Sequence, residues 1–422
     1  MNRSIEAADE PSQNTITQAA LDPGSLDPGP LDAADPLARF RDRFAPIEPG
    51  LVYLDGNSLG RPTKAALERV AAVAEAWSTR LIGGWDEGWL ELPVTVGDQL
   101  ARGVLGAEPG TVAMTDSTTV NLYRLAAAAL DARRSRRAVV IERSEFPTDR
   151  YVVGGLARER DLEIRWLDGD PVEGLTTSDV TTALDTEVAL VILSAANYRS
   201  GAIADIRAVT DAARAADALV LWDLSHAAGS IPVNLESNGV DLAVGCTYKY
   251  LNGGPGAPAF LYVRRELQDE LRPPIQGWFA QSDQFEMGPT FERRPGIEGW
   301  LVGTPGILGL TAAQAGIEVV AEAGIDAIRW KGIALTEYAV SLLDAWLAPL
   351  GCPLGSPRDA ARRGAHIAIR HPNAGALAGA LIERSVIVDY RAPDSIRVGM
   401  SPLTTSFEDV HRGISSLRSL LA

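Results

Sequence analysis

The chain has little of what disulfide frameworks, metal sites and secretion signals require. Only two of its 422 residues are cysteines, Cys246 and Cys352, which argues against a disulfide framework and is typical of a reducing compartment. The four histidines show neither a His-x-x-x-His pair with a glutamate nor a cysteine–histidine ligand spacing, so we expect no metal. The N-terminal letters MNRSIEAADE are acidic and contain no apolar run. We therefore expect no secretory signal, and a cytoplasmic protein.

Positive charge is also scarce. The chain has 39 Lys and Arg against 55 Asp and Glu, and its net charge of −16 argues against nucleic acid and anionic membranes as partners. No apolar run approaches the length of a membrane-spanning helix, so no membrane partner is expected. The length exceeds that of one ordinary domain and 46% of the residues are apolar. Two structured domains with sizeable cores are therefore expected.

The N-terminal region differs in composition from the rest. It contains LDPGSLDPGPLDAADP, a near-repeat with few aromatic residues that cannot bury enough apolar surface to order itself. We expect a flexible tail over residues 1–36 and ordered structure from about Pro36 onward.

Helical and strand periods alternate from about residue 65. Continuous apolar strands between helices are typical of a mostly parallel sheet that is covered on both faces. After residue 306 a long helical stretch and the strands HIAIRH, VIVDY and SIRVGM predict a second, smaller α/β domain. The expected helices of the first part are 65–81, 117–134 and 206–218, and the expected strands are 110–116, 136–142, 162–168, 187–198, 219–223, 240–247 and 259–267.

Polar residues follow several of these strands. Ligands of open α/β sheets bind at the carboxyl ends of the strands, so side chains at those ends are expected to meet. The residues near such ends are Asp116, Glu142, Ser194, Asp223 and Lys249.

Lys249 and Asp223 are the most informative pair among them. Burial favours the neutral, nucleophilic amine of a lysine, and a lysine at the end of a strand forms a Schiff base with pyridoxal phosphate (PLP) in many enzymes. An acidic residue on the neighbouring strand then holds the pyridine nitrogen protonated. The alternative is a structural lysine beside a capping aspartate.

Other segments would fit around such a cofactor. Ser117, Thr118 and Thr119 precede a predicted helix, where they would cap its N–H groups or hold a phosphate. His226 either lies against the cofactor ring or bonds to the backbone of its turn. Phe146 offers an aromatic face for stacking, although its segment FPTD (146–149) could be a plain loop.

Three further segments have competing explanations. The glycines of 253–256 lack the strand–GxGxxG–helix context, so we expect them to allow a tight turn beside Lys249 rather than to form a nucleotide loop. Trp278 is either part of a buried corner or a donor to a phosphate. Arg397, in the strand SIRVGM, suits a substrate carboxylate by its two parallel donors, but many strand arginines only face solvent.

Together these motifs resemble kynureninase, a PLP enzyme of the aspartate aminotransferase fold, or fold type I. The likeness runs from about residue 50 to 410, and TYKYLNGGPG together with DLSHAAG is its most specific part. The matching segments are LDGNSLGRPT (54–63), DSTTVNL (116–122), FPTD (146–149), WDLSHAAGSIPV (222–233), GCTYKYLNGGPG (245–256), GWF (277–279), VGTPGILGL (302–310) and IVDYRAPDSIRVGMSPLTTSF (387–407).

The resemblance implies a large PLP-binding domain over residues 76–305, with its sheet between helices, and a small C-terminal domain over 306–422. Residues 37–75 would contribute to the active site and to the small domain. It also implies a homodimer with active sites at the subunit interface, in which Thr304 reaches across. The ring pocket of the substrate is left open by the sequence, because the region around Trp85 aligns poorly.

The resemblance also assigns roles to individual residues. Lys249 would carry the cofactor and move protons, Asp223 would pair with the pyridine nitrogen, and Tyr248 would deliver a proton to the product. The expected cofactor-binding residues are Thr118, Thr119, Phe146, Asp149, Ser194, Asp223, His226, Tyr248, Lys249, Trp278 and Thr304, and the expected substrate-binding residues are Ser58 and Arg397.

The implied reaction is hydrolytic Cβ–Cγ cleavage of L-kynurenine, or of 3-hydroxykynurenine, to anthranilate or its 3-hydroxy form and L-alanine, in tryptophan degradation or NAD synthesis. A cysteine desulfurase or selenocysteine lyase of the same fold is the main alternative; it would need a nucleophilic cysteine, for which Cys352 is the candidate. An aminotransferase or a catalytically silent cofactor-binding protein are the others.

Overall fold

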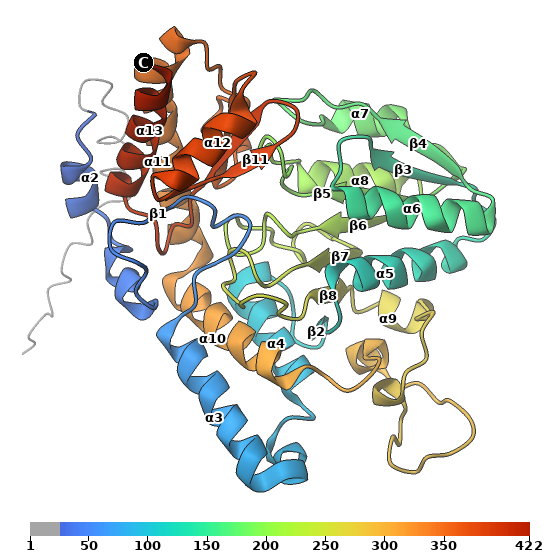
Figure 1. Cartoon of the computed structure of the whole chain (residues 1–422). Coiled ribbons are helices and arrows are strands. Elements are labelled where there is room, and N and C mark those ends of the chain that lie inside the picture. Colours follow the sequence, from blue (N-terminus) through green and yellow to red (C-terminus); the bar gives the residue numbers. More distant parts are fainter. Residues whose placement is uncertain (1–25) are drawn as a thin grey trace, which may run out of the picture.

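A seven-stranded sheet forms the centre of the larger part of the molecule (Figure 1). The structure is a computed structural model and describes residues 26–422. The strand order is β2-β8-β7-β6-β5-β3-β4, and only β8 runs antiparallel to its neighbours, which confirms the expected mostly parallel sheet. The strands are β2 (Val112–Met114), β3 (Ala138–Glu142), β4 (Glu163–Leu167), β5 (Val188–Ser194), β6 (Leu219–Asp223), β7 (Leu242–Gly245) and β8 (Phe260–Val263).

Helices cover both faces of this sheet because successive strand residues point to opposite sides. In β3, Val139 and Ile141 pack with the core under α5 (Thr118–Ala132) and α6 (Pro147–Arg160). Val140, between them, belongs to the other core, which includes residues of α7 (Thr177–Thr182) and α8 (Ile206–Ala215). The continuous apolar strands are therefore buried on both faces, as the sequence predicts.

The sequence does not predict α6. Its segment PTDRYVVGGLARER contains two glycines, which weaken a helical pattern, and it begins with a proline. Proline suits the first turn of a helix, where its missing N–H has no helical partner. Val153 and Leu156 of this helix are buried against the sheet, so tertiary packing stabilises it.

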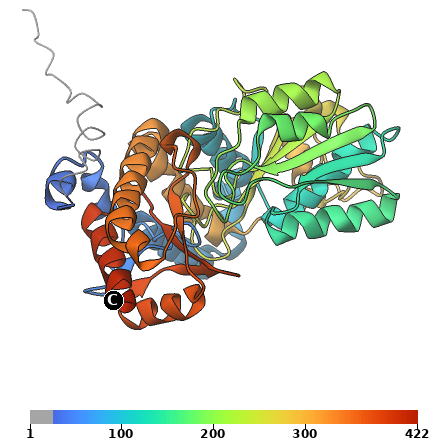
Figure 2. The same ribbon diagram turned by 90° about the horizontal axis from the view of Figure 1, so that it is seen from above.

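The smaller domain contains a three-stranded antiparallel sheet, in the order β11-β12-β9, and a two-stranded parallel pair, β1 and β10. Figure 2 shows it beside the large sheet, with its helices on the outside. Its strands are β1 (Val52–Tyr53), β9 (His366–Arg370), β10 (Val386–Ile387), β11 (Asp389–Arg391) and β12 (Ser395–Gly399), and its helices are α11 (Ile325–Leu342), α12 (Ala374–Glu383) and α13 (Phe407–Leu421). The pairing of β1 with β10 joins an early segment of the chain to this domain.

One expectation about apolar runs is wrong. Residues Ile325–Leu350 form a helical stretch of 26 residues with a mean hydropathy of 1.3 in its most apolar window, which by length and composition would suffice to cross a membrane. Half of that window is buried inside the protein. The stretch contributes Leu335, Tyr338 and Leu342 to the core of the small domain, so it is a core helix of that domain.

The expected flexible tail is also wrong for its last part. Residues 1–25 lie outside the described residues, but α2 (Gly29–Ala33) is helical and Leu31 is buried in the small-domain core. Asp32 accepts hydrogen bonds from the first backbone N–H groups of α13, and Asp35 forms a buried ion pair with Lys331 at 2.7 Å. These long-range contacts order a segment whose composition alone predicts disorder.

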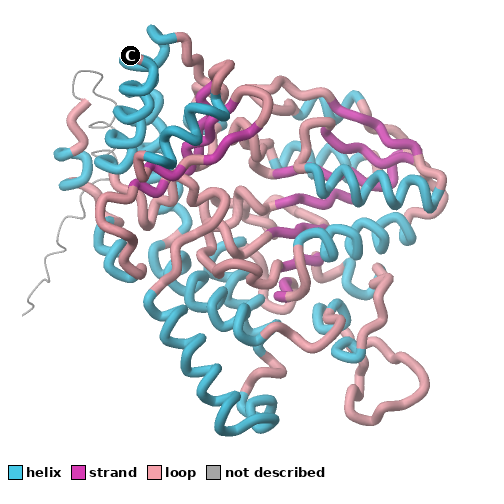
Figure 3. The backbone as a smooth tube through the Cα atoms, viewed as in Figure 1, coloured by secondary structure: helices cyan, strands magenta, loops and turns pink. Residues whose placement is uncertain are grey.

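Three further helices connect the two domains. α3 (Lys64–Arg80) and α10 (Ile307–Ala323) pack along each other, and α4 (Leu92–Leu100) packs between α10 and β2. Figure 3 shows loops gathering between the large sheet and the small domain. The carboxyl ends of β5 and β6 open into this region, which is where a ligand of such a sheet is expected.

Candidate active site

A cavity of about 470 Å³ lies at the carboxyl ends of the central strands. Its volume is in the range of small-molecule sites. Nine of the eleven expected cofactor-binding residues line it, from five separate segments of the chain, so the topology brings them together as expected. They are Thr118, Thr119, Phe146, Asp149, Ser194, Asp223, His226, Tyr248 and Lys249.

Lys249 lies in the turn that follows β7. The turn is held by a bond from the N–H of Gly60 to the carbonyl of Tyr248 at 2.8 Å, and a Cβ on Gly60 would lie only 2.2 Å from the carbonyl oxygen of Lys249. The Lys249 Nζ lies 3.3 and 3.4 Å from the two ring nitrogens of His226. Burial, and then the nearby charge of Lys249, hold the pKa of His226 well below its usual value. His226 is therefore a neutral neighbour of the amine.

Two buried carboxyl groups lie beside Lys249. Asp223 ends β6 and accepts a hydrogen bond from the backbone N–H of Ser225 at 2.7 Å. Asp149, in the first turn of α6, is 1% exposed, and neither of its oxygens meets a donor within residues 26–422. Burial, followed by the charges of Asp223 and Glu145 and by a hydrogen bond that the protonated acid can donate to Asp223, raises the pKa of Asp149 well above its usual value. An orphaned buried acid of this kind suits a ligand that brings its own donor.

The opposite wall of the cavity is the N-terminus of α5. Ser117 caps this helix by accepting from the N–H of Val120, and Thr118 and Thr119 form its first turn. The helix is 15 residues long, and its free N–H groups and dipole favour an anion at this end. The structure thus places hydroxyls and a helix terminus together, at the position predicted for a phosphate.

Phe146 completes the cavity from the side. Its ring contacts the ring of Tyr198 edge-on, with the centroids 5.4 Å apart, and the Lys249 Nζ lies 5.9 Å from its centroid. An aromatic face toward the amine is what the sequence predicts for a residue that stacks on a cofactor ring.

Arg397 and Ser58 lie next to this cavity but do not line it. Arg397 is buried in β12, donates to the carbonyl of Tyr198 at 2.6 Å and to the hydroxyl of Ser58 at 3.1 Å, and forms an ion pair with Asp389. The structure therefore brings the two predicted substrate residues together, and shows in addition that the guanidinium already has a carboxylate partner.

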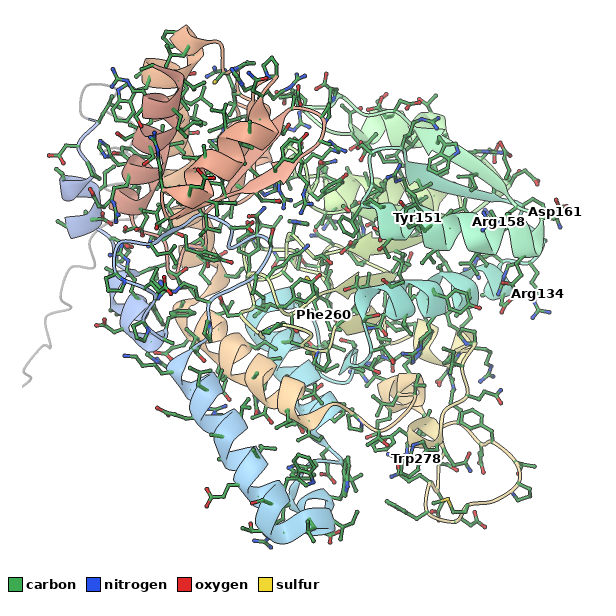
Figure 4. All side chains as sticks on the ribbon, viewed as in Figure 1. Arg134, Tyr151, Arg158, Asp161, Phe260 and Trp278 are labelled. Atoms are coloured by element: carbon green, nitrogen blue, oxygen red, sulfur yellow. The ribbon has the colours of Figure 1, made fainter. Side chains whose placement is uncertain are left out.

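Trp278 and Thr304 lie outside the cavity. Trp278 is 42% exposed and packs against Phe279 and Phe285 in the loop-rich segment at the edge of the molecule (Figure 4). Thr304 is exposed, just before α10. The chain therefore does not bring these two residues to its own cavity, and the expectation that Trp278 contacts the phosphate is not met within one copy.

Comparison with known proteins identifies the family. The kynureninase of Burkholderia pseudomallei (strain 1106a) is 43% identical over 398 residues, which cover 92% of this chain and 94% of that protein. This chain belongs to the kynureninase family. A family model described as the kynureninase C-terminal domain also matches residues 328–417.

Solved structures agree with the fold that the kynureninase resemblance implies. A cysteine desulfurase from Thermococcus onnurineus NA1 superposes with a TM-score of 0.80 at 19% identity, covering 91% of this chain and 98% of that one. A mutant of the protein C-DES, solved with glycine covalently linked to its PLP cofactor, gives a TM-score of 0.77 at 18% identity, with 88% and 97% covered. At these identities the likeness shows the fold alone, which is that of fold type I.

Sequence reasoning missed two residues of this kynureninase site. Tyr198 lines the cavity and links Phe146 to Arg397. It is the last residue of the predicted strand 187–198, and this position at a strand end could have marked it as a site residue. Glu145 is 2% exposed, accepts a hydrogen bond from the N–H of Ser194 and shares a second, short hydrogen bond with the Ser194 hydroxyl. Nothing in the loop sequence RSEF signals this contact, because Ser194 is 49 positions away.

One expected member of the strand-end group lies elsewhere. Glu142 ends β3, but it accepts from Ser144 and faces a small separate space beside Asn197. The strand β3 lies beyond β5 in the sheet order, so the end of β3 is one strand further from Lys249 than the end of β5 is. Glu142 is therefore not part of the cavity wall.

Cys352, the candidate nucleophile of the desulfurase or selenocysteine lyase alternative, is not at the site. Cys352 is fully buried in the core of the small domain, and burial raises the pKa of its thiol. A thiol in that position is neither accessible nor acidic enough to act as a nucleophile. Within residues 26–422 there is also no cluster of three or more His, Cys, Asp or Glu that could hold a metal.

Proposed function

We propose that this member of the kynureninase family binds PLP at Lys249 and hydrolyses the Cβ–Cγ bond of L-kynurenine, releasing anthranilate and L-alanine. The single observation that supports this most is the position of Lys249. It faces two buried acids across a cavity of suitable volume, in a chain that is 43% identical to a kynureninase. 3-Hydroxykynurenine is the second substrate of the same reaction.

The residues around the cavity fit this cofactor. Lys249 would hold it covalently, the N-terminus of α5 with Thr118 and Thr119 would hold its phosphate, and Phe146 would lie on its ring. The protonated ring nitrogen would supply the donor that Asp149 lacks and a partner for Asp223. When bound, PLP withdraws electrons from the carbon atoms next to the substrate amine.

The chain's own residues would then move the protons. Lys249, once the substrate amine has taken its place, is positioned to remove the proton from Cα, because its Nζ projects toward the cavity beside a neutral histidine. Burial raises the pKa of the Tyr248 hydroxyl, so Tyr248 keeps its proton at neutral pH and can give it to Cβ of the leaving alanine. The Ser58–Arg397 pair is available for the substrate carboxylate.

A second copy of the chain would complete the site. The exposed side chains of Trp77, Leu81 and Ile82 form an apolar patch at the end of α3. Beside the patch is a groove of about 330 Å³ that Ile307 and Leu308 also line, only three residues after Thr304. Trp85, within this region, contacts Phe279, the neighbour of Trp278, with centroids 6.3 Å apart.

The patch therefore lies near the segments that carry Thr304 and Trp278, the two predicted site residues that are missing from the cavity. We expect light scattering to give twice the chain mass, and Leu81→Asp with Ile82→Asp to give monomers that bind PLP more weakly. A monomer with undiminished PLP affinity would refute this arrangement.

The decisive experiment has two readouts. First, the PLP-loaded protein is reduced with borohydride and digested; the chain contains only three lysines, Lys64, Lys249 and Lys331, so the labelled peptide is unambiguous. We expect the label on Lys249. Second, L-kynurenine is added and anthranilate fluorescence is compared with the amount of L-alanine.

The possible outcomes separate the rival functions. Equal amounts of anthranilate and alanine establish the hydrolysis. A label on Lys249 without anthranilate, but with alanine and sulfide from L-cysteine, would instead support the desulfurase. Turnover of kynurenine only with an added keto acid would indicate an aminotransferase, and a labelled protein without any turnover would indicate a cofactor-binding protein.

A further inference from the structure

Glu145 is a buried acid that contacts the site through Ser194. It lies in the loop between β3 and α6, outside the cavity wall, and is 2% exposed. Its Oε1 accepts from the backbone N–H of Ser194 at 2.6 Å, and its Oε2 forms a short hydrogen bond with the Ser194 hydroxyl. Ser194 ends β5, pairs in register with Asp223 and lines the cavity.

The hydroxyl of Ser194 carries one proton and can therefore donate only one hydrogen bond. An ionised Glu145 can only accept, so it takes both the N–H and the O–H of Ser194, and the hydroxyl then offers the cavity a lone pair. A protonated Glu145 donates from Oε2 to the hydroxyl oxygen instead. The proton of Ser194 is then free to point into the cavity, so the protonation state of Glu145 decides whether Ser194 is a donor or an acceptor there.

The surroundings of Glu145 favour its protonated form at neutral pH. Glu142 at the end of β3, Asp149 in α6 and Asp223 at the end of β6 all place carboxyl groups near it. Burial is the largest effect, and together with the charges of Glu142 and Asp223 it outweighs the bonds from Ser194 and raises the pKa of Glu145 to about 8.

We propose that Glu145 is a positioning residue that, by holding or releasing a proton taken from solvent, sets the Ser194 hydroxyl as a hydrogen-bond donor or acceptor toward the bound cofactor. The inference rests on the proposed function, because it assumes that PLP occupies the cavity. Below about pH 8 the hydroxyl donates to an oxygen of the cofactor. Above it the donor is lost, and the lone pair of Ser194 faces that oxygen instead.

The test compares PLP affinity and the visible spectrum of the loaded protein over pH 7 to 9. Glu145→Gln has the same shape, and its amide permanently donates to the Ser194 hydroxyl while its carbonyl accepts the N–H. The variant therefore mimics the protonated state at every pH. We expect the ratio of its PLP affinity to that of the wild type to rise about tenfold between pH 7 and 9, the effect of one hydrogen bond to a charged group.

Two further variants make the test specific. Ser194→Ala removes the intermediary, so Glu145→Gln should have no effect on the pH profile in that background. Ser194→Ala alone should also abolish the wild-type change near pH 8, which keeps the test valid if Glu145→Gln fails to fold. Glu142→Gln removes a neighbouring charge and should move the transition to lower pH without reducing its size.

The outcomes distinguish this inference from the proposed function. A pH-independent affinity ratio, or a change that persists without the Ser194 hydroxyl, would overturn the role of Glu145 and leave PLP binding intact. Absence of PLP binding in the wild type would overturn the proposed function itself.

Discussion

Two buried charged groups border the same cavity and are satisfied very differently. On the large-domain side, Asp149 has no donor for either carboxyl oxygen within residues 26–422. On the small-domain side, Arg397 is bonded to Asp389, to Ser58 and to the carbonyl of Tyr198. Both side chains are 1% exposed, so solvent does not account for the contrast.

This difference in hydrogen-bond partners indicates which of the two groups requires a ligand. An unsatisfied buried acid is costly, and such a group persists where a ligand supplies the missing partner. A buried arginine whose two terminal nitrogens are already bonded costs less to bury, so a substrate carboxylate must share or displace one of those partners. Asp149 thus indicates a ligand directly, whereas Arg397 does so only through its position.

The largest effect is expected from the residue that both groups surround. Lys249→Ala should lower turnover of kynurenine by about 10⁴-fold, the upper end for loss of a positioned acid–base group, and abolish the visible absorbance of bound PLP. Steady-state kinetics and the absorbance spectrum measure the two effects. The control is Lys64→Ala, which removes an exposed lysine and should change neither. If Lys249→Ala kept both the turnover and the absorbance of bound PLP, the cavity between Asp149 and Arg397 would not be the cofactor site.

The next test concerns the unsatisfied acid itself. Asp149→Asn should weaken PLP binding. At a pH high enough to ionise the wild-type acid, it should also raise the free energy of unfolding of the cofactor-free protein by about 1–3 kcal/mol, because a neutral amide costs less to bury than a carboxylate. The raised pKa of Asp149 means that the folded state binds its proton more tightly than the unfolded state does. Stability of the cofactor-free wild type should therefore fall as pH rises above the usual aspartate range, and the variant should lack this part of the fall.

Asp241 provides the matched control for Asp149. It is also a buried acid, 3% exposed, but Arg264 pairs with it at 3.0 Å and the N–H of Val220 donates to it. Asp241→Asn should therefore lower the free energy of unfolding, in the opposite direction to Asp149→Asn. Chemical denaturation of both cofactor-free variants measures this. Equal signs for the two substitutions would mean that the hydrogen bond of the protonated acid with Asp223 is enough to stabilise Asp149 without a ligand.

The sequence predicts the positions of Asp149 and Arg397 but not the contrast between their hydrogen-bond partners. Strand ends and apolar runs predict the sheet, and with it the meeting of Asp223, Ser194 and Lys249, because a parallel sheet has few possible topologies. The family resemblance adds Asp149 as a site residue. Neither indicates whether a charged side chain has partners, since Asp389 and Tyr198 reach Arg397 only in the folded chain.

Other features were not predicted for the same reason, because they depend on contacts that form only in the folded chain. The segment 26–36 is ordered by contacts of Asp32 and Asp35 with residues about 300 or more positions away, which its composition cannot show. The bond between Glu145 and Ser194 joins the loop after β3 to the end of β5. Trp278 and Thr304 were predicted at the site, but the fold of one copy does not bring them there, so their placement depends on contacts beyond the single chain.

The smallest expected effects concern Arg397 and the residues around it. Arg397→Ala should raise KM for kynurenine about 10- to 100-fold, the loss of hydrogen bonds to a charged carboxylate, with a smaller change in kcat. Ser58→Ala removes one neutral donor and should raise KM only about fivefold. Initial-rate kinetics with the intact, PLP-loaded protein measures both. The visible spectrum should stay unchanged, because Arg397 does not line the cavity.

Arg391 provides the control that tells substrate binding by Arg397 from a structural role of its ion pair with Asp389. It also pairs with Asp389, at 2.9 Å, but its side chain is 36% exposed and it makes no bond to Ser58. Arg391→Ala should therefore change KM less than about threefold, as expected for a partly exposed ion pair. If both arginine variants raised KM equally, or if Arg397→Ala lowered stability without changing KM, Arg397 would be a structural residue held by Asp389. The substrate carboxylate would then have to bind a donor other than Arg397.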